Sequence, residues 1–359
     1  MSNFKVEFTL KQHTPIIHFQ SNQHGATLRA SELKPKFDKF LLEKVPDLPV
    51  KVNANGHKSL DYKIKIEPNL ARAEEINSKD SLFFGNMGDG DDKKYKQYQR
   101  TFKIEFFSFI SKIQEAIEEY FENFLANTNF GTRQSKGYGS FYIYNKQFDK
   151  LLINKKVYNF SSTNWEKDIK VLYSFLRQGI NIPSRDGTRF YSKPAIFSYA
   201  KSKGWTWDKK AIKKAYFNDK LSSQSGEAVE YQSDQEYLLR DLFGLSSEQS
   251  WLSYNKATIS KDNKDIERFK SPITFKILDN KVYFWANDTY KDILNKTFKI
   301  KAGKGKDSLE LTTPKKFDFD DFFKFAFNID LNNHIANEYH SQSEYAILEK
   351  IFKEIKESK

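Results

Sequence analysis

The residues with the clearest potential for chemistry lie in one stretch, FGTRQSKGYGSF, at 130–141. It combines glycines that allow close approach to the main chain with two cations and an aromatic ring: Gly131, Gly137, Gly139, Arg133, Lys136 and Tyr138. Backbone N–H groups presented beside basic side chains suit a phosphate chain. The alternative is a helix C-cap followed by a tight turn, with Tyr138 either stacking a base or packing in the core. The terminal Gly-Lys-Ser/Thr of a P-loop is missing.

A second basic group follows the first expected strand and consists of Arg29, Lys34, Lys36 and Lys39. These side chains could contact an RNA backbone across a sheet from the glycine stretch. The competing interpretation is a solvated helix face. Arginine binds a phosphate through two parallel hydrogen bonds, so Arg29 and Arg133 are stronger candidates than the lysines.

Three histidines lie close together in the sequence, His13, His18 and His24. One reading is acid–base catalysis on an RNA 2′-hydroxyl, with His18 or His24 as the catalytic group. His13 and His18 are separated by an odd number of residues, so one continuous strand would point them to opposite faces. No thiol or carboxylate completes a metal site around them, and we expect neither a metal nor a cofactor.

Two further groups of residues admit a functional and a structural reading. Asp89, Asp91 and Asp92 could bind Mg²⁺, but no Glu stands at the twelfth position of an EF-hand loop, and a solvated loop is favoured. Trp205 and Trp207 in GWTW could form a stacking platform, although core packing or a subunit contact is favoured.

Composition narrows the class of partner. The 359 residues include 59 Lys+Arg against 47 Asp+Glu, a net charge of +12, which favours a polyanion. Aromatic residues make up 16% of the chain, more than enough for a core and for base stacking. Cysteine is absent, which excludes disulfides and thiolate chemistry. MSNFKVEFTL lacks an apolar signal segment, so we expect a cytoplasmic protein with no membrane partner.

The elements that must position these residues follow from hydrophobic periodicity. Alternation predicts strands at 4–10 and 60–66, and three- and four-residue steps predict a helix at about 102–125. A helix is expected to begin near Pro35, and FYIY reads as a closing strand. The resulting β–α–β–loop–α–β order is compatible with a ferredoxin-like or RRM-like α+β sandwich. Further on we expect helices at 168–180, 234–245, 289–298 and 343–357, and a hairpin at Asp279-Asn280.

Three stretches, taken in order, resemble a known family. TPIIHFQSNQHGATLRASELKPKFDKFL resembles the opening of the repeat-associated mysterious protein (RAMP) superfamily of CRISPR-associated effector subunits, and FGTRQSKGYGSF is similar to its glycine-rich loop. ERFKSPITFKI resembles a strand of the type III-B (Cmr) subunit located toward the guide 3′ end.

This resemblance implies an α+β protein of two tandem ferredoxin-like (RRM-like) domains with helical insertions, at 1–147 and 148–359. It implies a non-catalytic RNA-binding subunit of a type III antiviral effector, with CRISPR RNA, target RNA and other effector subunits as partners. Arg29, Arg133 and Lys136 are then the best RNA-binding candidates. The alternatives are a metal-independent CRISPR-RNA-processing endoribonuclease using His18 or His24, and a protein–protein scaffold.

Overall fold

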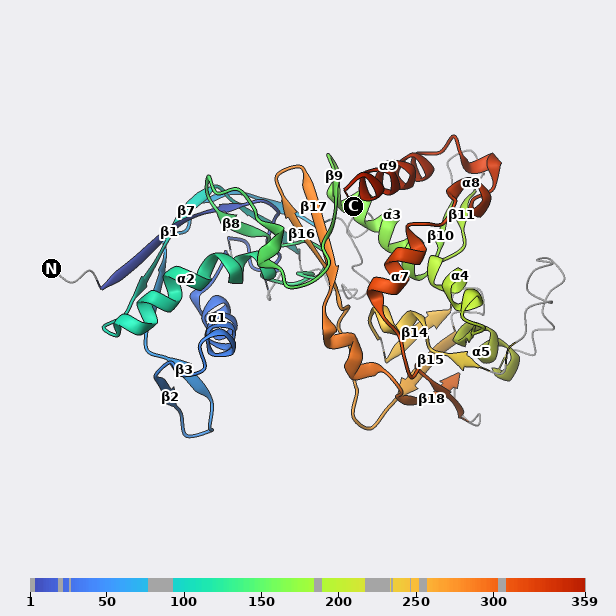
Figure 1. Ribbon diagram of the computed structural model, residues 1–359, viewed down its shortest axis with the longest axis horizontal. Helices are drawn as coiled ribbons and strands as arrows, with labels where there is room; N and C mark the ends of the chain where they lie inside the picture. The colour runs from blue at the N-terminus through green and yellow to red at the C-terminus, as the bar shows by residue number, and fades with distance from the viewer. Residues whose placement is uncertain are drawn as a thin grey trace. The chain divides into compact units, whose positions relative to one another are not determined.

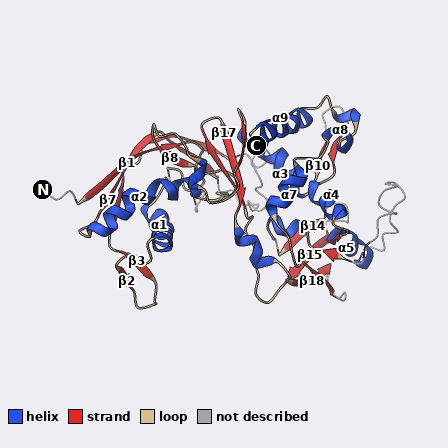
Figure 2. Cartoon of the chain, in the orientation of Figure 1, coloured by secondary structure: helices blue, strands red, loops and turns tan. Residues whose placement is uncertain are grey.

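The computed structural model describes residues 4–18, 22–25, 27–76, 93–183, 189–216, 233, 235–245, 247–251, 257–302 and 308–358. It divides into two units (Figures 1 and 2). Unit 1 comprises Met1–Glu166 with Thr274–Trp285, and unit 2 comprises Lys167–Ile273 with Ala286–Lys359. Within the described ranges, no helix combines the length and the apolar character needed to cross a bilayer. The domain boundary expected at 147/148 stays a prediction; the units divide the chain elsewhere.

Unit 1 is built on a four-stranded antiparallel sheet covered by two helices. Its elements are β1 (Lys5–Gln12), α1 (Ala30–Lys44), β2 (Val50–Val52), β3 (Lys58–Leu60), β4 (Lys63–Ile66), β5 (Leu70–Glu75), β6 (Tyr95–Gln99), β7 (Thr101–Phe107), α2 (Ser111–Asn127), β8 (Phe141–Ile143), the 3-10 helix η1 (Lys150–Leu152), β9 (Tyr158–Ser161), β16 (Ile273–Leu278) and β17 (Lys281–Ala286). The strands of the main sheet follow the order β4–β7–β1–β8, with α1 after β1 and α2 after β7. Pairs β2–β3 and β5–β6 form ribbons, and β16–β17–β9 form a small sheet.

An aromatic core joins the helices of unit 1 to the sheet. Phe37 of α1 lies 4.8 Å from Phe124 of α2, and Phe106 of β7 lies 4.8 Å from Phe121, measured between ring centroids. All four side chains are buried. Truncating one such ring to Ala costs about 3–5 kcal/mol, so these contacts fix how α1 and α2 sit on the sheet.

Two sequence predictions in unit 1 were wrong about element bounds. The helix expected at 102–125 is strand β7 followed by α2, because Phe102, Ile104 and Phe106 alternate toward the core as a strand does. The helix expected from Pro35 begins at Ala30, with Pro35 in its second turn. The hairpin at Asp279-Asn280 is confirmed, and Asp279 adopts a φ of 52° there.

Unit 2 combines a six-stranded sheet with several helices. Its elements are α3 (Trp165–Arg177), β10 (Ile180–Pro183), β11 (Arg189–Ser192), α4 (Ala195–Ser202), β12 (Thr206–Trp207), α5 (Asp208–Tyr216), β13 (Glu236–Tyr237), η2 (Arg240–Phe243), β14 (Glu248–Trp251), β15 (Ala257–Asp262), η4 (Asp288–Ile293), β18 (Thr297–Ala302), β19 (Leu309–Thr312), α7 (Phe319–Ala326), α8 (Leu331–His334), η5 (Asn337–Tyr339) and α9 (Ser343–Glu357). The helix expected at 234–245 is instead strand β13 and the 3-10 helix η2, and that expected at 289–298 is η4 followed by β18.

The sheet of unit 2 has its own strand order, β12–β13–β19–β18–β15–β14. Its pairs β12–β13 and β13–β19 are parallel, and its other pairings are antiparallel. The helices expected at 168–180 and 343–357 are present as α3 and α9. The whole chain is therefore a mixed α+β protein.

Candidate nucleic-acid interface

The three stretches singled out in the sequence meet in unit 1. The N–H of Gly139 donates to the carbonyl of Pro15 at 2.8 Å, which joins the glycine loop, Phe130–Phe141, to the TP segment. The N–H of Phe275 in β16 donates to the carbonyl of Ser135 at 3.2 Å. Segments more than a hundred residues apart in the sequence thus fix the loop together.

Small polar side chains complete this attachment. Thr14 Oγ1 donates to the carbonyl of Gly137 at 2.6 Å and accepts from the N–H of Ser140 at 2.9 Å. Asn129 Nδ2 donates to the carbonyls of Gln134, at 2.7 Å, and Phe275, at 2.8 Å. These bonds are buried or partly buried, so the loop has a defined conformation.

The loop glycines serve this packing directly. Gly139 has a φ of 66°, and a Cβ there would come closer than 3.0 Å to the carbonyl oxygen of Phe130. A Cβ on Gly131 would meet the carbonyl oxygen of Ile17, and one on Gly137 would meet the side chain of Ile277. The glycines predicted to let RNA approach the main chain therefore let other parts of unit 1 approach it.

Helix α1 supports the loop through one of its faces. Glu32 Oε1 accepts from the N–H of Gly131 at 2.7 Å and from Lys36 Nζ at 3.0 Å. Lys36 Nζ also donates to Gln134 Oε1 at 3.1 Å and lies 5.0 Å from the centre of the Phe130 ring. Arg29, the N-cap residue of α1, is exposed and donates to Gln23 Oε1 at 2.9 Å. Since Arg29, Glu32 and Lys36 recur at three- and four-residue steps, they share that face.

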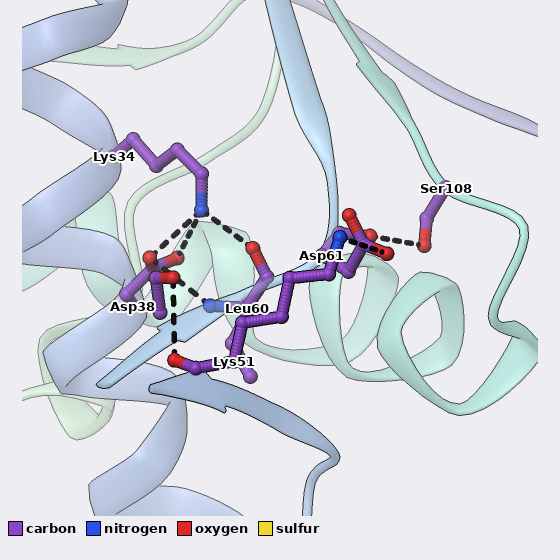
Figure 3. Close-up of polar contacts among 7 residues, drawn as sticks. Lys34, Asp38, Lys51, Leu60, Asp61 and Ser108 are labelled. Atoms are coloured by element: carbon purple, nitrogen blue, oxygen red, sulfur yellow. Dashed lines mark hydrogen bonds and ion pairs between the residues drawn. The ribbon is translucent and has the colours of Figure 1, made fainter. Parts of the chain in front are cut away.

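The other two lysines of α1 point elsewhere. Lys34 Nζ binds both carboxylate oxygens of Asp38, at 3.0 and 2.7 Å, and the carbonyl of Leu60 at 2.8 Å (Figure 3). It also lies 3.9 Å from the centre of the Tyr62 ring, so it ties α1 to β3 and to the segment between β3 and β4. Lys39 is 81% exposed and pairs with Glu43 at 3.9 Å. The structure thus separates Lys34 and Lys39 from the glycine loop.

The cations of the loop itself differ in exposure. Arg133 adopts a φ of 57° and is partly exposed, and burial lowers the pKa of its guanidinium from the ordinary value. Lys136 is only 7% exposed, and its N–H donates to the carbonyl of Arg133 at 2.8 Å. Of these two predicted phosphate ligands, Arg133 is the one with a partly solvent-facing side chain.

Tyr138 is a core residue in this structure. Its side chain is fully buried, its hydroxyl donates to Glu166 Oε1 at 2.7 Å, and its ring meets that of Trp165 edge-on at 5.0 Å. Lys96 Nζ binds the same Glu166 oxygen at 2.7 Å. The ring is therefore not presented for stacking on a base.

Sequence reasoning missed Lys276 of β16, which lies beneath the loop. Its side chain is fully buried, and Nζ donates to the carbonyls of Leu125 (2.6 Å), Thr128 (2.9 Å) and Phe141 (3.0 Å), with Asn129 Oδ1 at 3.3 Å. Burial lowers the pKa of this lysine to about 7. Lys276 therefore caps the C-terminal end of α2 just where the chain enters the loop.

The three histidines near the N-terminus differ in their surroundings. Burial lowers the pKa of His13 to about 4, and its Nδ1 accepts from the N–H of Asp279 at 2.9 Å. His18 is buried at 3% exposure, whereas His24 is exposed and meets the Tyr95 ring edge-on at 5.1 Å.

The predicted acidic cluster cannot be placed, because Asp89, Asp91 and Asp92 lie outside the described residues. In the part of the chain that is described, no group of three or more His, Asp or Glu side chains is arranged to hold a metal ion.

Family models match both halves of the chain. A family model of the Cmr1 N-terminal domain matches residues 3–180, and one of the Cmr1 C-terminal domain matches residues 191–357. No curated protein matches the chain. Among solved structures, the chain is similar to Cmr1 from Pyrococcus furiosus in its apo form, with 12% identity and a TM-score of 0.33, over 80% of this chain and 89% of that one.

The family models identify a RAMP-superfamily subunit of the CRISPR effectors, as the resemblance predicted. The chain belongs to the Cmr1 family, and it is accordingly a component of a type III-B Cmr effector complex, with the other subunits of that complex as its partners.

Proposed function

We propose that this Cmr1-family chain is a non-catalytic subunit that binds the CRISPR RNA, or its duplex with the target, through the glycine loop of unit 1. The observation that carries the proposal is the construction of that loop. The TP segment, β16 and α1 hold it in one conformation, and they leave Arg133 partly exposed on it, with exposed Arg29 at the start of the supporting helix.

The contacts to RNA come from side chains rather than from loop amides. The N–H groups of Gly131, Thr132 and Gly139 all donate within the protein, and so do those of Lys136 and Gly137. An arginine can instead chelate a phosphate through two N–H groups in one plane. In this proposal, Arg133 and Arg29 bind the phosphates of the RNA backbone, and the glycines and Lys36 keep the loop in place.

The strand order of unit 1 supports the expectation that this unit is a ferredoxin-like domain. A βαββαβ succession whose sheet runs β4–β7–β1–β8 is the arrangement expected of a ferredoxin-like domain. We extend the ferredoxin-like description to unit 1 on this ground. For unit 2, whose sheet includes parallel pairs, it stays a prediction.

Filter binding of guide-length RNA across a salt series tests the role of Arg133. Single-stranded RNA should give a slope of log K against log salt of about −0.7 per phosphate contacted. Arg133→Ala should make the slope shallower by about one contact. The matched control is Arg72→Ala, because Arg72 is an exposed arginine of β5 paired with Glu74 at 3.3 Å. A slope unchanged by Arg133→Ala removes this residue from the interface.

The absence of catalysis is tested separately. The purified chain is incubated with repeat RNA in the presence of a chelator, and the RNA should remain intact. The burial of His18, which is only 3% exposed, supports this expectation for that residue. Cleavage that is abolished by His18→Ala or His24→Ala would instead assign a processing endoribonuclease.

A further inference from the structure

Three phenylalanines form an exposed cluster at one end of the main sheet of unit 1. Phe109 lies 5.1 Å from Phe4 and 4.9 Å from Phe107, measured between ring centroids, and Phe4 lies 6.4 Å from Phe107. The N–H of Ser108 donates to the carbonyl of Phe4 at 3.1 Å, which holds the start of β1 beside the end of β7 (Figure 1). These three rings, the phenylalanine cluster, lie outside the buried core of unit 1.

The cluster is more exposed than packing within one chain explains. Phe109 is 73% exposed and Phe4 is 38% exposed. Phe107 faces away from the core, because its neighbour Phe106 is buried and side chains alternate along β7. An apolar residue before a helix N-cap can stabilise the helix by packing on its fourth residue, but in α2 that residue is Gln114. Exposed rings with a polar surround are typical of a protein–protein contact.

The charges around the cluster are balanced. The two rows of the sheet nearest to it, with the residue after β4, contribute six charged side chains on the face of Phe107: Lys5, Lys63, Lys65, Glu7, Glu67 and Glu105. Lys5 pairs with Glu105 at 3.5 Å, and Lys65 pairs with Glu67 at 2.7 Å. Three lysines against three glutamates give no excess of cations for a phosphate chain, so this surface favours a protein over RNA.

Lys63 is the charge that a partner could complement. It lies across from Phe107 in the row next to the cluster, and it is exposed. No carboxylate in the described part of the chain forms an ion pair with it. Glu7 lies one row further from the cluster and across from Glu105. A surface that covers the rings should therefore bring a carboxylate to Lys63.

We propose that the phenylalanine cluster is a docking surface for another subunit of the type III-B effector complex. That subunit presents an apolar side chain to Phe109 and a carboxylate to Lys63. Membership of the Cmr1 family makes this chain a component of such a complex, and the exposed rings with a balanced surround fit a subunit contact. The inference rests on that membership and is independent of RNA binding by the glycine loop.

Photocrosslinking in the assembled complex tests the docking surface. The photoreactive analogue p-benzoylphenylalanine replaces Phe109, whose side chain is already mostly in solvent. The chain is assembled with the other subunits and guide RNA, irradiated, and the product is identified by mass spectrometry. The label should attach to another subunit, in a segment with an apolar residue and a carboxylate. Attachment to RNA or to a second copy of this chain, or no product at all, would overturn the proposal.

The strength of the contact is measured by biolayer interferometry of the full chain on an immobilised complex that lacks it. Phe109→Ser should weaken binding about 10-fold or more, as expected when an interface loses a central aromatic anchor. Leu151→Ser is the matched control, because Leu151 of η1 is 81% exposed and apolar but lies outside the cluster. Its affinity should stay at the wild-type value.

The charge is tested on the same immobilised complex. Lys63→Glu should weaken binding about 3-fold or more at low salt and less at high salt, because exposed charges are screened. Lys103→Glu is the control, since Lys103 is exposed on the same face of β7 but further from the cluster, and it should bind like wild type.

Two results from these variants count against the docking surface. One is Phe109→Ser that joins the complex as tightly as wild type; the other is Phe109→Ser that loses affinity for guide-length RNA alone, which would assign the rings to RNA. If circular dichroism shows that Phe109→Ser does not fold, Lys63→Glu and the crosslink decide. Arg133→Ala should leave the crosslink from position 109 unchanged, so this proposal and the glycine-loop proposal fail separately.

Discussion

At the scale of single residues, Lys276 shows how one side chain can hold a loop that it does not belong to. Its Nζ is surrounded by four acceptor oxygens, three of them main-chain carbonyls at the end of α2 and the start of β8. A buried carbonyl that loses its donor costs about 1–3 kcal/mol. The entry and exit of the glycine loop therefore depend on this lysine.

Lys276→Met should lower the free energy of unfolding by about 2–4 kcal/mol, because methionine fills a similar volume and donates no hydrogen bond. Urea unfolding followed by circular dichroism measures the change. Lys281→Met is the control, since Lys281 is exposed on the neighbouring strand β17, and it should change stability by at most about 0.5 kcal/mol. Equal effects of the two substitutions would show that Lys276 does not stabilise the loop.

The pH dependence of stability gives a second test of the same residue. The pKa of Lys276 is lowered from 10.5 to about 7, so between these values the unfolded chain binds a proton that the folded chain does not. Stability contributed by this group therefore rises as pH increases from 7 toward 10.5, by at most about 1.4 kcal/mol per pH unit, and is flat below 7. The difference in unfolding free energy between wild type and Lys276→Met should grow over that window. A pH-independent difference would contradict the assigned titration.

The residue types of the candidate interface stand out in the sequence, but their structural partners do not. The glycine stretch and Arg29 stand out by composition, whereas the Glu32–Gly131 bond joins residues 99 positions apart. Lys276 alternates with Phe275 and Ile277 along β16, so periodicity assigns it to solvent. It is buried because β16 is covered on both faces from Phe275 onward.

At the scale of elements, strand β7 shows what hydrophobic periodicity can and cannot decide. Apolar residues at 102, 104 and 106 fit a strand, and those at 102, 106, 109 and 113 fit a helix equally well. Pairing of β7 with β1 over Lys5–Lys11 settles the choice, and that contact is not visible in a local pattern. The order β–α–β–α–β was predicted correctly, while the inner strand that completes the sheet was missed.

Gly139→Ala should be among the most destabilising substitutions of the loop. An alanine there must adopt a left-handed conformation and push its Cβ against the Phe130 carbonyl, which together cost about 3 kcal/mol or more. Gly56→Ala is a matched control, because Gly56 has a φ of +77° and no heavy atom within 4 Å of the added Cβ. It should cost only about 1–2 kcal/mol of backbone strain. Thermal unfolding of both variants measures the difference between their losses of stability. Similar losses would mean that the loop is not closely packed.

At the scale of the whole molecule, the chain completes its first unit only after much of the second has been synthesised. Thr274–Trp285 belongs to unit 1, although the preceding residues from Lys167 belong to unit 2. Strand β17 pairs with β9 from Lys281–Ser161 to Phe284–Tyr158, and β16 supplies Phe275 and Lys276 to the glycine loop. A contiguous N-terminal piece therefore lacks one of the segments that hold the glycine loop.

This arrangement predicts the behaviour of two fragments. Residues 1–166 alone should unfold at a lower temperature than the same residues joined through a flexible Gly/Ser linker to 273–286, because only the second fragment contains β16 and β17. The melting temperatures should differ by several degrees, since the Tm of a domain of this size changes by about 2–4 °C per kcal/mol of stability. Placing Lys276→Met in the linked fragment should remove much of the gain. If the two fragments melt together, the returning hairpin contributes nothing to unit 1, and the support proposed for the glycine loop has to come from α1 and the TP segment alone.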